Sequence, residues 1–468
     1  MTSMAMPATT FGPMSVSVFD MQALQHLWSS EELRRIFSEA NRIQKWLDIE
    51  AALAAAQARL GIIPEEAARG IAGQARAERI DLAKLGAETR RIKHSLVPTL
   101  RQFQALCPGE TGQWLHYGAT TQDILDTGMV LQIRDAHAAF LRDISAIGRE
   151  LARLAEAHRG TVMAGRTHAV QALPITFGHK CAIWLDEVER HHIRLKEIEP
   201  RIFVGLLVGA VGTQASYGPE ARAVERLTLE GLGLAVPDIS WAPARDRFAE
   251  YANLLALIGG TLGKIGNELL NLQRNEIAEV EEGFNEGKLG SSTMPHKRNP
   301  VLAENIACLS RALRYSAALM TEAMVAEHER DGIAWKTEWK AMPECCLIAG
   351  AMLSQTADLL RALRVDAEAM RRNLDVMRGY VLSERVMLAL GTKVGKQNAH
   401  EWVYEASMHG IENRLDFADA MRRHPRIAAV LEEEEIRSLT EPAGYLGQIS
   451  ASIDRVLARV RESGWLND

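Results

Sequence analysis

The chain has 468 residues, of which 47% are apolar and 24% are charged, and its formal net charge is −6. This composition is typical of a globular protein with a large buried core, and without a long Lys/Arg block it argues against a nucleic-acid partner. No segment of the sequence is long and apolar enough to span a membrane. The five cysteines have no metal-ligand spacing, which fits a reduced, cytoplasmic protein.

Residues 1–16 have neither the cationic start nor the apolar core of a signal peptide, so we expect a flexible extension there. Apolar residues then recur every three or four positions over residues 30–60. This spacing predicts a helix, which the Gly-Ile-Ile-Pro segment at 61–64 ends. Arg42 lies in this helix, and the pattern alone leaves open whether it faces solvent or a ligand.

Two polar segments precede the first long helix. His94 lies in the first, and a single histidine in such a segment is most often structural. Residues 118–123 are rich in hydroxyl groups and are expected to form a short loop before a helix that opens at Ile124. Thr120, Thr121 and Gln122 suit a carboxylate ligand, because the amide groups and the dipole of a helix start attract an anion.

Four long apolar segments follow, with nearly all prolines between them. They predict helices over 127–157, 178–199, 247–282 and 301–329. Helices of this length and composition must bury wide faces against one another, which predicts a bundle. The third has apolar residues on more than one face, so we expect partner subunits to cover it. Strand character is confined to residues 202–208.

Further helices are expected from Asp366 to the C-terminus. The predicted fold class is therefore all-α, with three mostly helical domains. Their predicted bounds are 17–123 for the N-terminal domain, 124–365 for a central bundle of long helices, and 366–468 for the C-terminal domain.

The segment 287–300 joins two of the predicted helices. Between its hinge glycines and its end it concentrates hydroxyl, cationic and amide side chains: Ser291, Ser292, Thr293, His296, Lys297, Arg298 and Asn299. Loops positioned by rigid helices often carry function, so this segment is interpreted as a lid that carries chemistry. The alternative is a solvated basic turn.

Three motifs resemble those of one enzyme superfamily. Gly-Ser-Ser-Thr-Met-Pro-His-Lys-Arg-Asn-Pro at 290–300, His-Tyr-Gly-Ala-Thr-Thr-Gln-Asp at 116–123 and Gly-Arg-Thr-His at 165–168 look like segments of the fumarase/aspartase superfamily. Within this superfamily, the residues of these motifs are most similar to those of adenylosuccinate lyases and bacterial carboxymuconate cycloisomerases. The similarity runs from about Phe19 to near the C-terminus. It implies a homotetramer whose active sites are shared between subunits.

The resemblance also implies a reaction, anti β-elimination across a succinyl unit. Ser291 matches the residue proposed as base, although it could instead only bind substrate. His168 matches the general acid, and His94 matches a histidine that supports this acid. The residues implied in binding the small dicarboxylate are Thr120, Thr121, Gln122, Thr167, Ser292, Lys297, Asn299, Arg330 and Arg42. Neither a metal cluster nor a phosphate-binding Gly-rich motif is visible, so we expect no cofactor.

The chain departs from each of the two families. The Arg-Tyr-x-x-Pro-Glu-Met segment of adenylosuccinate lyases is absent, and Trp335 and Trp339 stand where nucleotide-binding members have serines and an arginine. These changes remove phosphate donors, so an AMP group is not expected. Cycloisomerases carry Trp in that span too, but they have Trp at the position of His168 and lack a histidine at that of His94.

The sequence therefore predicts a C–N lyase that acts on a small, non-nucleotide succinate and releases fumarate. An N-substituted aspartate or a nitrosuccinate is the expected type of substrate. The alternatives are a 3-carboxy-cis,cis-muconate cycloisomerase-like enzyme, an adenylosuccinate lyase, and a non-catalytic relative of the kind that serves as a structural protein of the lens.

Overall fold

The computed structural model describes residues 15–283, 293–294 and 296–467. Most of the predicted N-terminal extension lies outside this range. So do Ser291 and Ser292, the two serines predicted at the site. Among the described residues no helix is both long and apolar enough to cross a membrane.

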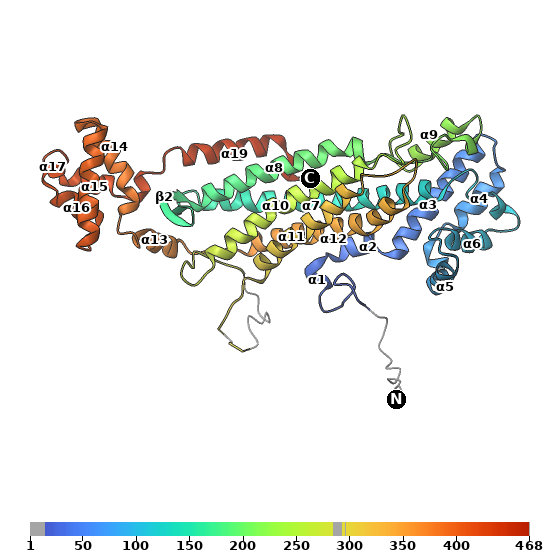
Figure 1. Ribbon diagram of the computed structural model, residues 1–468, viewed down its shortest axis with the longest axis horizontal. Helices are drawn as coiled ribbons and strands as arrows, with labels where there is room; N and C mark the ends of the chain where they lie inside the picture. The colour runs from blue at the N-terminus through green and yellow to red at the C-terminus, as the bar shows by residue number, and fades with distance from the viewer. Residues whose placement is uncertain (1–14, 284–292, 295, 468) are drawn as a thin grey trace. The chain divides into compact units, whose positions relative to one another are not determined.

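The all-α prediction is confirmed. The described residues form nineteen α-helices and only two small sheets (Figure 1). The chain divides into two compact units. The first contains Met1–Leu141, Arg194–Gly260 and Cys308–Ser354, and the second contains Arg142–Ile193, Thr261–Ala307 and Gln355–Asp468. The three predicted domains stay a prediction.

Seven helices, most of them short, lie wholly within the described part of the first unit. They are α1 (Gln25–Trp28), α2 (Glu31–Ile36), α3 (Glu39–Arg59), α4 (Glu65–Gln74), α5 (Leu82–Ile92), α6 (Val97–Leu106) and α9 (Ala221–Gly231). The single helix predicted over 30–60 is wrong, because α2 ends at Ile36 and α3 starts at Glu39. The side chain of Ser38 accepts a hydrogen bond from the Asn41 amide and thereby caps α3 (3.2 Å). Apolar spacing alone does not reveal such an internal cap.

Five long helices contribute to both units. They are α7 (Thr121–Ala157), α8 (Phe177–Ile202), α10 (Asp246–Leu272), α11 (Val301–Glu322) and α12 (Gly332–Ala362). Within the first unit α10 packs closely on α11, since a Cβ added to Gly259 would lie 2.7 Å from Leu313. Within the second unit Gly266 similarly faces Ala303 and Ile306. These close approaches form the predicted bundle of helices.

Three predicted helix ends were wrong. Helix α7 starts at Thr121 instead of Ile124, because the Asp123 carboxylate accepts from the Thr120 amide and caps the helix earlier (3.1 Å). Helix α10 ends at Leu272 instead of 282, ahead of a turn in which Ala278 has a left-handed backbone. Helix α11 ends at Glu322 instead of 329, and His328, also left-handed, lies in the segment after it.

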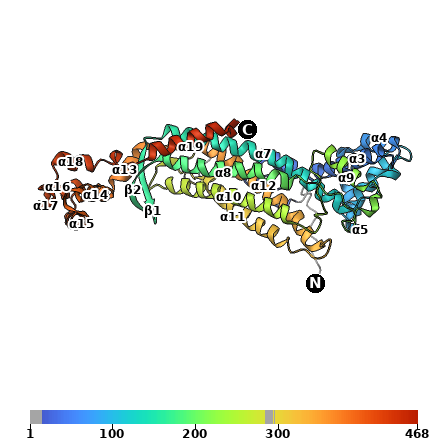
Figure 2. The same ribbon diagram turned by 90° about the horizontal axis from the view of Figure 1, so that it is seen from above.

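A β-hairpin that the sequence did not predict belongs to the second unit (Figure 2). Strand β1 (Val162–Thr167) pairs antiparallel with β2 (Val170–Thr176), and His168 and Ala169 form the two-residue turn. The expected strand over 202–208 is only an isolated bridge between Val204 and Ala235. Two-residue hairpin turns usually contain Asn-Gly or a similar pair, and the His-Ala turn lacks that signature.

The rest of the second unit is also helical apart from two short strands, β3 (Val280–Glu281) and β4 (Arg364–Val365). Its helices are α13 (Ala367–Asp375), α14 (Ser383–Val394), α15 (Lys396–Glu412), α16 (Phe417–Arg423), α17 (Pro425–Ala428), α18 (Glu433–Leu439) and α19 (Ile449–Ser463). Helices α14 to α18 enclose a small core of their own that includes Leu390, Phe417 and Met421.

Candidate active site

Arg330 joins two of the predicted substrate-binding residues in the first unit. Its Nε donates to the side-chain oxygen of Gln122 (2.9 Å), and its Nη2 donates to Thr120 Oγ1 (3.1 Å) and to the carbonyl of Ala210 (3.0 Å). Thr120 precedes α7, Gln122 lies in its first turn, and Arg330 lies in the segment between α11 and α12. The fold therefore gathers three residues that the sequence predicted separately.

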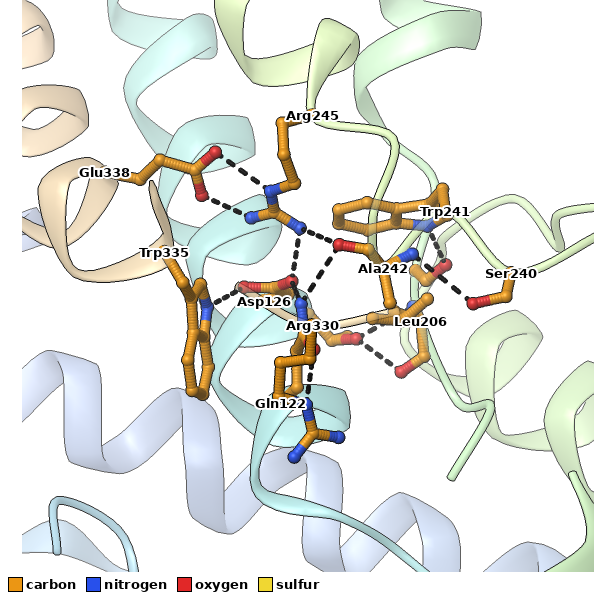
Figure 3. A network of polar contacts seen from close by, with 12 residues as sticks. Gln122, Asp126, Leu206, Ser240, Trp241, Ala242, Arg245, Arg330, Trp335 and Glu338 are labelled. Carbon is orange, nitrogen blue, oxygen red and sulfur yellow. Dashed lines mark hydrogen bonds and ion pairs between the residues drawn. The ribbon is translucent and has the colours of Figure 1, made fainter. Parts of the chain in front are cut away.

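A buried ionic network lies behind Gln122 (Figure 3). The amide nitrogen of Gln122 donates to Asp126 (3.1 Å), and Asp126 also accepts from Trp335 Nε1 (2.7 Å) and Arg245 Nη1 (2.7 Å). Arg245 binds Glu338 through two nitrogens, with Nε at 2.9 Å from the carboxylate. Because Gln122 donates to Asp126, its oxygen is directed toward Arg330. The network thus fixes the orientation of this amide.

Burial and charge set the protonation of the network. Burial opposes the charge of Arg245, but Asp126 and Glu338 outweigh it and raise the pKa of the guanidinium above its usual range. Burial raises the pKa of Glu338 to about 7, although Arg245 acts to lower it. Both side chains are almost fully buried, at 4% and 3% exposure. Sequence analysis missed Asp126, Arg245 and Glu338, and the four-residue spacing from Gln122 to Asp126 on one helix face was the available signal.

Asp123 holds the start of α7 in place. Its fully buried carboxylate accepts from the amides of Val208 (2.9 Å) and Gly209 (3.1 Å) and from the Tyr217 hydroxyl (3.0 Å), besides the amide of Thr120. Burial raises the pKa of Asp123, and these four donors act to lower it. Asp123 therefore ties the segment that carries Thr120 and Thr121 to the loop after α8.

His94 has a defined tautomer. Its Nδ1 accepts from the backbone amides of Leu96 (3.3 Å) and Val97 (3.1 Å), so in the neutral ring the hydrogen is on Nε2. Nε2 lies 3.4 Å from Thr121 Oγ1. The ring both supports the start of α6 and points its N–H toward the start of α7. This pair joins two further predicted residues within the first unit.

Arg42, predicted in substrate binding, lies in α3 and is not a solvated surface residue. It lines a partly open cavity of about 60 Å³ in the first unit together with Ser95, Asp126 and Glu338. Burial lowers the pKa of Arg42, and Glu39 acts to raise it. Five predicted residues, Thr120, Gln122, Arg330, His94 and Thr121, therefore form two hydrogen-bonded groups, and Arg42 lines a cavity shared with the network.

Thr167 and His168 belong to the second unit and are exposed at the end of the hairpin. His168 and Ala169 have φ angles of 51° and 64°, a left-handed conformation that is unfavourable for both residue types. Two such residues in succession store strain of the kind found at functional turns. The imidazole of His168 has no hydrogen-bond partner among the described residues, so it is available to a ligand.

The hairpin is anchored through Arg166. The guanidinium of Arg166 binds the buried carboxylate of Glu279 with two hydrogen bonds, of 3.0 and 2.6 Å. Glu279 also accepts from the side-chain amide of Asn373 in α13 (2.8 Å), and the Asn373 carbonyl accepts from Gln171 in β2 (2.8 Å). These contacts connect both strands to α13 and so fix the base of the turn that carries His168.

Lys297 and Asn299 also lie in the second unit, where they line an open hollow of about 1320 Å³. Lys297 is exposed and Asn299 is half-buried. Charges of both signs surround them: Arg274 and Arg364 line the hollow, and so do Glu276 and Asp366. No group of three or more His, Cys, Asp or Glu side chains in the part of the chain that the structure describes has a metal-binding arrangement.

Comparison with known proteins shows the family to which the chain belongs. A family model described as "Lyase" matches residues 28–313, and one described as "Adenylosuccinate lyase C-terminus" matches residues 379–456. The chain belongs to the fumarase/aspartase superfamily. This membership confirms the resemblance seen in the three motifs, and it confirms that the protein is a lyase of this superfamily.

Several members of the superfamily match almost the whole chain. N-acetyl-S-(2-succino)cysteine lyase of Dickeya dadantii (strain 3937) is 46% identical, with 97% of this chain and 100% of the relative covered. 3-Carboxy-cis,cis-muconate cycloisomerase of Pseudomonas aeruginosa is 41% identical, with 92% and 95% covered. The crystal structure of a fumarate lyase from Mesorhizobium sp. BNC1 superimposes with a TM-score of 0.87 at 41% identity, with 92% and 98% covered.

Proposed function

We propose that the protein releases fumarate from a small, non-nucleotide succinate by eliminating a heteroatom substituent. The observation that carries the proposal is the 46% identity, over nearly the whole chain, to a relative named for N-acetyl-S-(2-succino)cysteine. A thioether of succinate is therefore the proposed substrate, with a sulfur leaving group in place of the nitrogen that the sequence led us to expect. A nitrogen-linked succinate is the second candidate, because His94 and His168 match adenylosuccinate lyases.

The reaction that we propose moves one proton and one electron pair through the succinate. A base removes a proton from the carbon next to one carboxylate, the electron pair forms the carbon–carbon double bond, and the carbon–sulfur bond breaks toward sulfur. The products are fumarate and a thiolate, which then takes up a proton. Ser291 is the proposed base, and His168, with His94 in support, is the proposed donor of this proton.

The carbanion next to a carboxylate is the difficult intermediate. Donors held in place before the reaction stabilise such charge, each by about 3–4 kcal/mol when well placed. Arg330 is suited to this role because Thr120, Gln122 and Ala210 engage its Nε and Nη2, whereas its Nη1 hydrogens have no partner among the described residues. We propose that Nη1, together with Lys297 and Asn299, binds the substrate carboxylates, with Thr167 and Ser292 as further ligands.

The active enzyme is proposed to be a cytoplasmic homotetramer with shared active sites. The resemblance to the superfamily supports this assembly. Large apolar side chains on the surface of the first unit support it too, because exposed groups of this size mark contact surfaces. Examples are Leu257, Tyr315 and Val325, at 57%, 76% and 78% exposure.

The proposed function is tested by offering the purified enzyme N-acetyl-S-(2-succino)cysteine and following the ultraviolet absorbance of fumarate. We expect fumarate and one equivalent of free thiol from this substrate, and no turnover of adenylosuccinate. Fumarate from an N-substituted aspartate alone would favour the nitrogen-linked substrate instead. If no succinate derivative is cleaved and a carboxymuconate is lactonised, the proposal is wrong.

The sulfur and nitrogen leaving groups are expected to differ in how much they depend on protonation by His168. An amine must accept a proton before it departs, whereas a thiol ionises near pH 8.5 and leaves more easily as the anion. The two substrates are therefore expected to respond differently to His168→Asn, with the smaller loss of kcat for the thioether.

A further inference from the structure

The side-chain amide of Gln122, a predicted substrate ligand, is bonded at both ends within the protein (Figure 3). Its nitrogen donates to Asp126 Oδ2 (3.1 Å) and to the carbonyl of Ala242 (3.3 Å), and its oxygen accepts from Arg330 Nε (2.9 Å). Gln122 is buried, with an exposure of 2%. Both hydrogens of the amide therefore have acceptors, and none is left for a substrate carboxylate.

The orientation of this amide is fixed from both sides. Asp126 is held as an acceptor, because its Oδ1 accepts from Trp335 Nε1 and its Oδ2 accepts from Arg245 Nη1, each at 2.7 Å. A backbone carbonyl, such as that of Ala242, also only accepts, whereas a guanidinium only donates. Turning the amide over would place its NH₂ group against Arg330 and its oxygen against two acceptors.

Arg330 is the group that this orientation serves. Its guanidinium is planar, so bonds to Nε and Nη2 together fix the direction of Nη1. Gln122 holds Nε, and Thr120 and Ala210 hold Nη2. Nη1 has no partner among the described residues, and the side chain is only half-buried, so a ligand can reach Arg330 more readily than Gln122. Without Gln122, the guanidinium would be held at one nitrogen and could turn about it.

We propose that Gln122 is a positioning residue, which directs Arg330 Nη1 at a substrate carboxylate and does not touch the substrate itself. Asp126 sets the orientation of Gln122, so the buried network acts on the reaction through this one amide. The inference rests on the proposed function, in which Arg330 binds a carboxylate, and deepens it by assigning the residue that directs this arginine.

Gln122→Met tests the assignment, because it removes the amide and keeps an unbranched side chain of similar size. Calorimetry with fumarate measures the binding of a dicarboxylate. We expect a dissociation constant about 10-fold higher for the variant than for the wild type, as for the loss of one hydrogen bond to a charged group. An unchanged dissociation constant would overturn the assignment.

Arg330→Met separates positioning from direct contact. In this background no guanidinium remains to be directed, so adding Gln122→Met should change the fumarate dissociation constant by less than about 2-fold. If Gln122 bound the substrate directly, or served only the stability of the fold, its replacement would have the same effect in both backgrounds. A loss of about 10-fold in both would therefore overturn the assignment.

Gln132→Met is the matched control. Gln132 lies ten positions further along α7, is equally buried at 1% exposure, and donates through its amide nitrogen to the carbonyl of Ile36 (2.7 Å). We expect this variant to bind fumarate like the wild type. Equal weakening by Gln122→Met and Gln132→Met would show a general effect of losing a buried amide and would contradict the inference.

A crystal structure of Gln122→Met decides the positioning without any ligand. We expect the guanidinium of Arg330 to leave the place that it holds in the wild type, and to keep it in Gln132→Met. An unmoved Arg330 in Gln122→Met would overturn the inference. Gln122→Leu, which lacks the same amide, takes its place if Gln122→Met does not fold. Wild-type protein that binds no fumarate, with Arg330 displaced in the variant, would overturn only the proposed function.

Discussion

Two of the polar networks described above have a guanidinium group at their centre. Arg330 joins Thr120 to Gln122, and Arg245 joins Asp126 to Glu338. A planar fork of five donors serves several acceptors at fixed angles, and the ammonium group of lysine does not. Individual acids and amides near the site are therefore oriented by arginine and are not free to rotate.

The central prediction about a single residue is that Ser291 acts as the base. If its hydroxyl oxygen removes the proton, Ser291→Ala should abolish turnover and leave substrate affinity largely intact, because the contacts to the carboxylates remain. Single-turnover kinetics together with calorimetry of the bound substrate measure the two quantities separately. Normal turnover by the variant would show that Ser291 is not the base.

Glu338 predicts a pH dependence of stability. Burial raises its pKa from an ordinary value of 4.5 to about 7. Between these values the folded protein retains the proton that the unfolded chain releases, so Glu338 makes the wild type less stable as the pH rises. Glu338→Gln cannot titrate. We expect the melting temperature of the variant, relative to wild type, to rise from pH 4.5 to pH 7. A constant difference would contradict the raised pKa.

At the scale of elements, a hairpin and a helix start carry most of the predicted site. The first turn of α7 is fixed by Asp123, which accepts four hydrogen bonds, and the β1–β2 hairpin is fixed by Arg166 and Glu279. Asp123 and Arg166 lie in the sequence close to the residues that they position, whereas Glu279 lies 113 positions from Arg166. A strained turn such as His168–Ala169 persists only where the surrounding structure holds it.

Removing one partner of the Arg166–Glu279 pair tests whether this pair holds the turn that carries His168. Arg166→Met leaves the buried Glu279 carboxylate without its cation, and breaking a buried pair in this way costs about 3–5 kcal/mol. We expect a lower unfolding midpoint and a reduced kcat, because the turn that carries His168 loses its support. The double variant Arg166→Met, Glu279→Gln should recover part of the stability, since no unpaired charge remains. A single variant as stable as the wild type would argue against the anchor.

At the scale of the whole molecule, the described chain leaves large apolar side chains on the surface of its first unit. Leu257 in α10 and Val325, which follows α11, line the same surface groove. A groove of this kind fits contact with another copy of the chain.

Light scattering tests the assembly directly. We expect a mass of four chains for the wild type and a smaller mass for Val325→Asp, because a charge in an apolar contact costs more than the contact contributes. Val376→Asp is the control, since Val376 is 70% exposed, belongs to the second unit and does not line this groove. Its mass should remain that of the wild type. A monomer in wild-type solution would contradict the proposed tetramer.

The sequence by itself determined the family, the all-α class and the approximate positions of the long helices. Motifs and apolar periodicity are local properties, so they survive without knowledge of the fold. Helix ends were less well predicted, because caps such as Ser38 and Asp123 act through single hydrogen bonds that periodicity does not record.

Only the tertiary structure decided which residues meet. Arg330 lies 208 positions from Gln122, and Arg245 lies 119 from Asp126, yet each pair is hydrogen-bonded. The packing of distant helices sets such contacts, and no spacing in the sequence encodes them. The same packing formed the cavity beside Arg42, because a site lined by several helices exists only once they have come together.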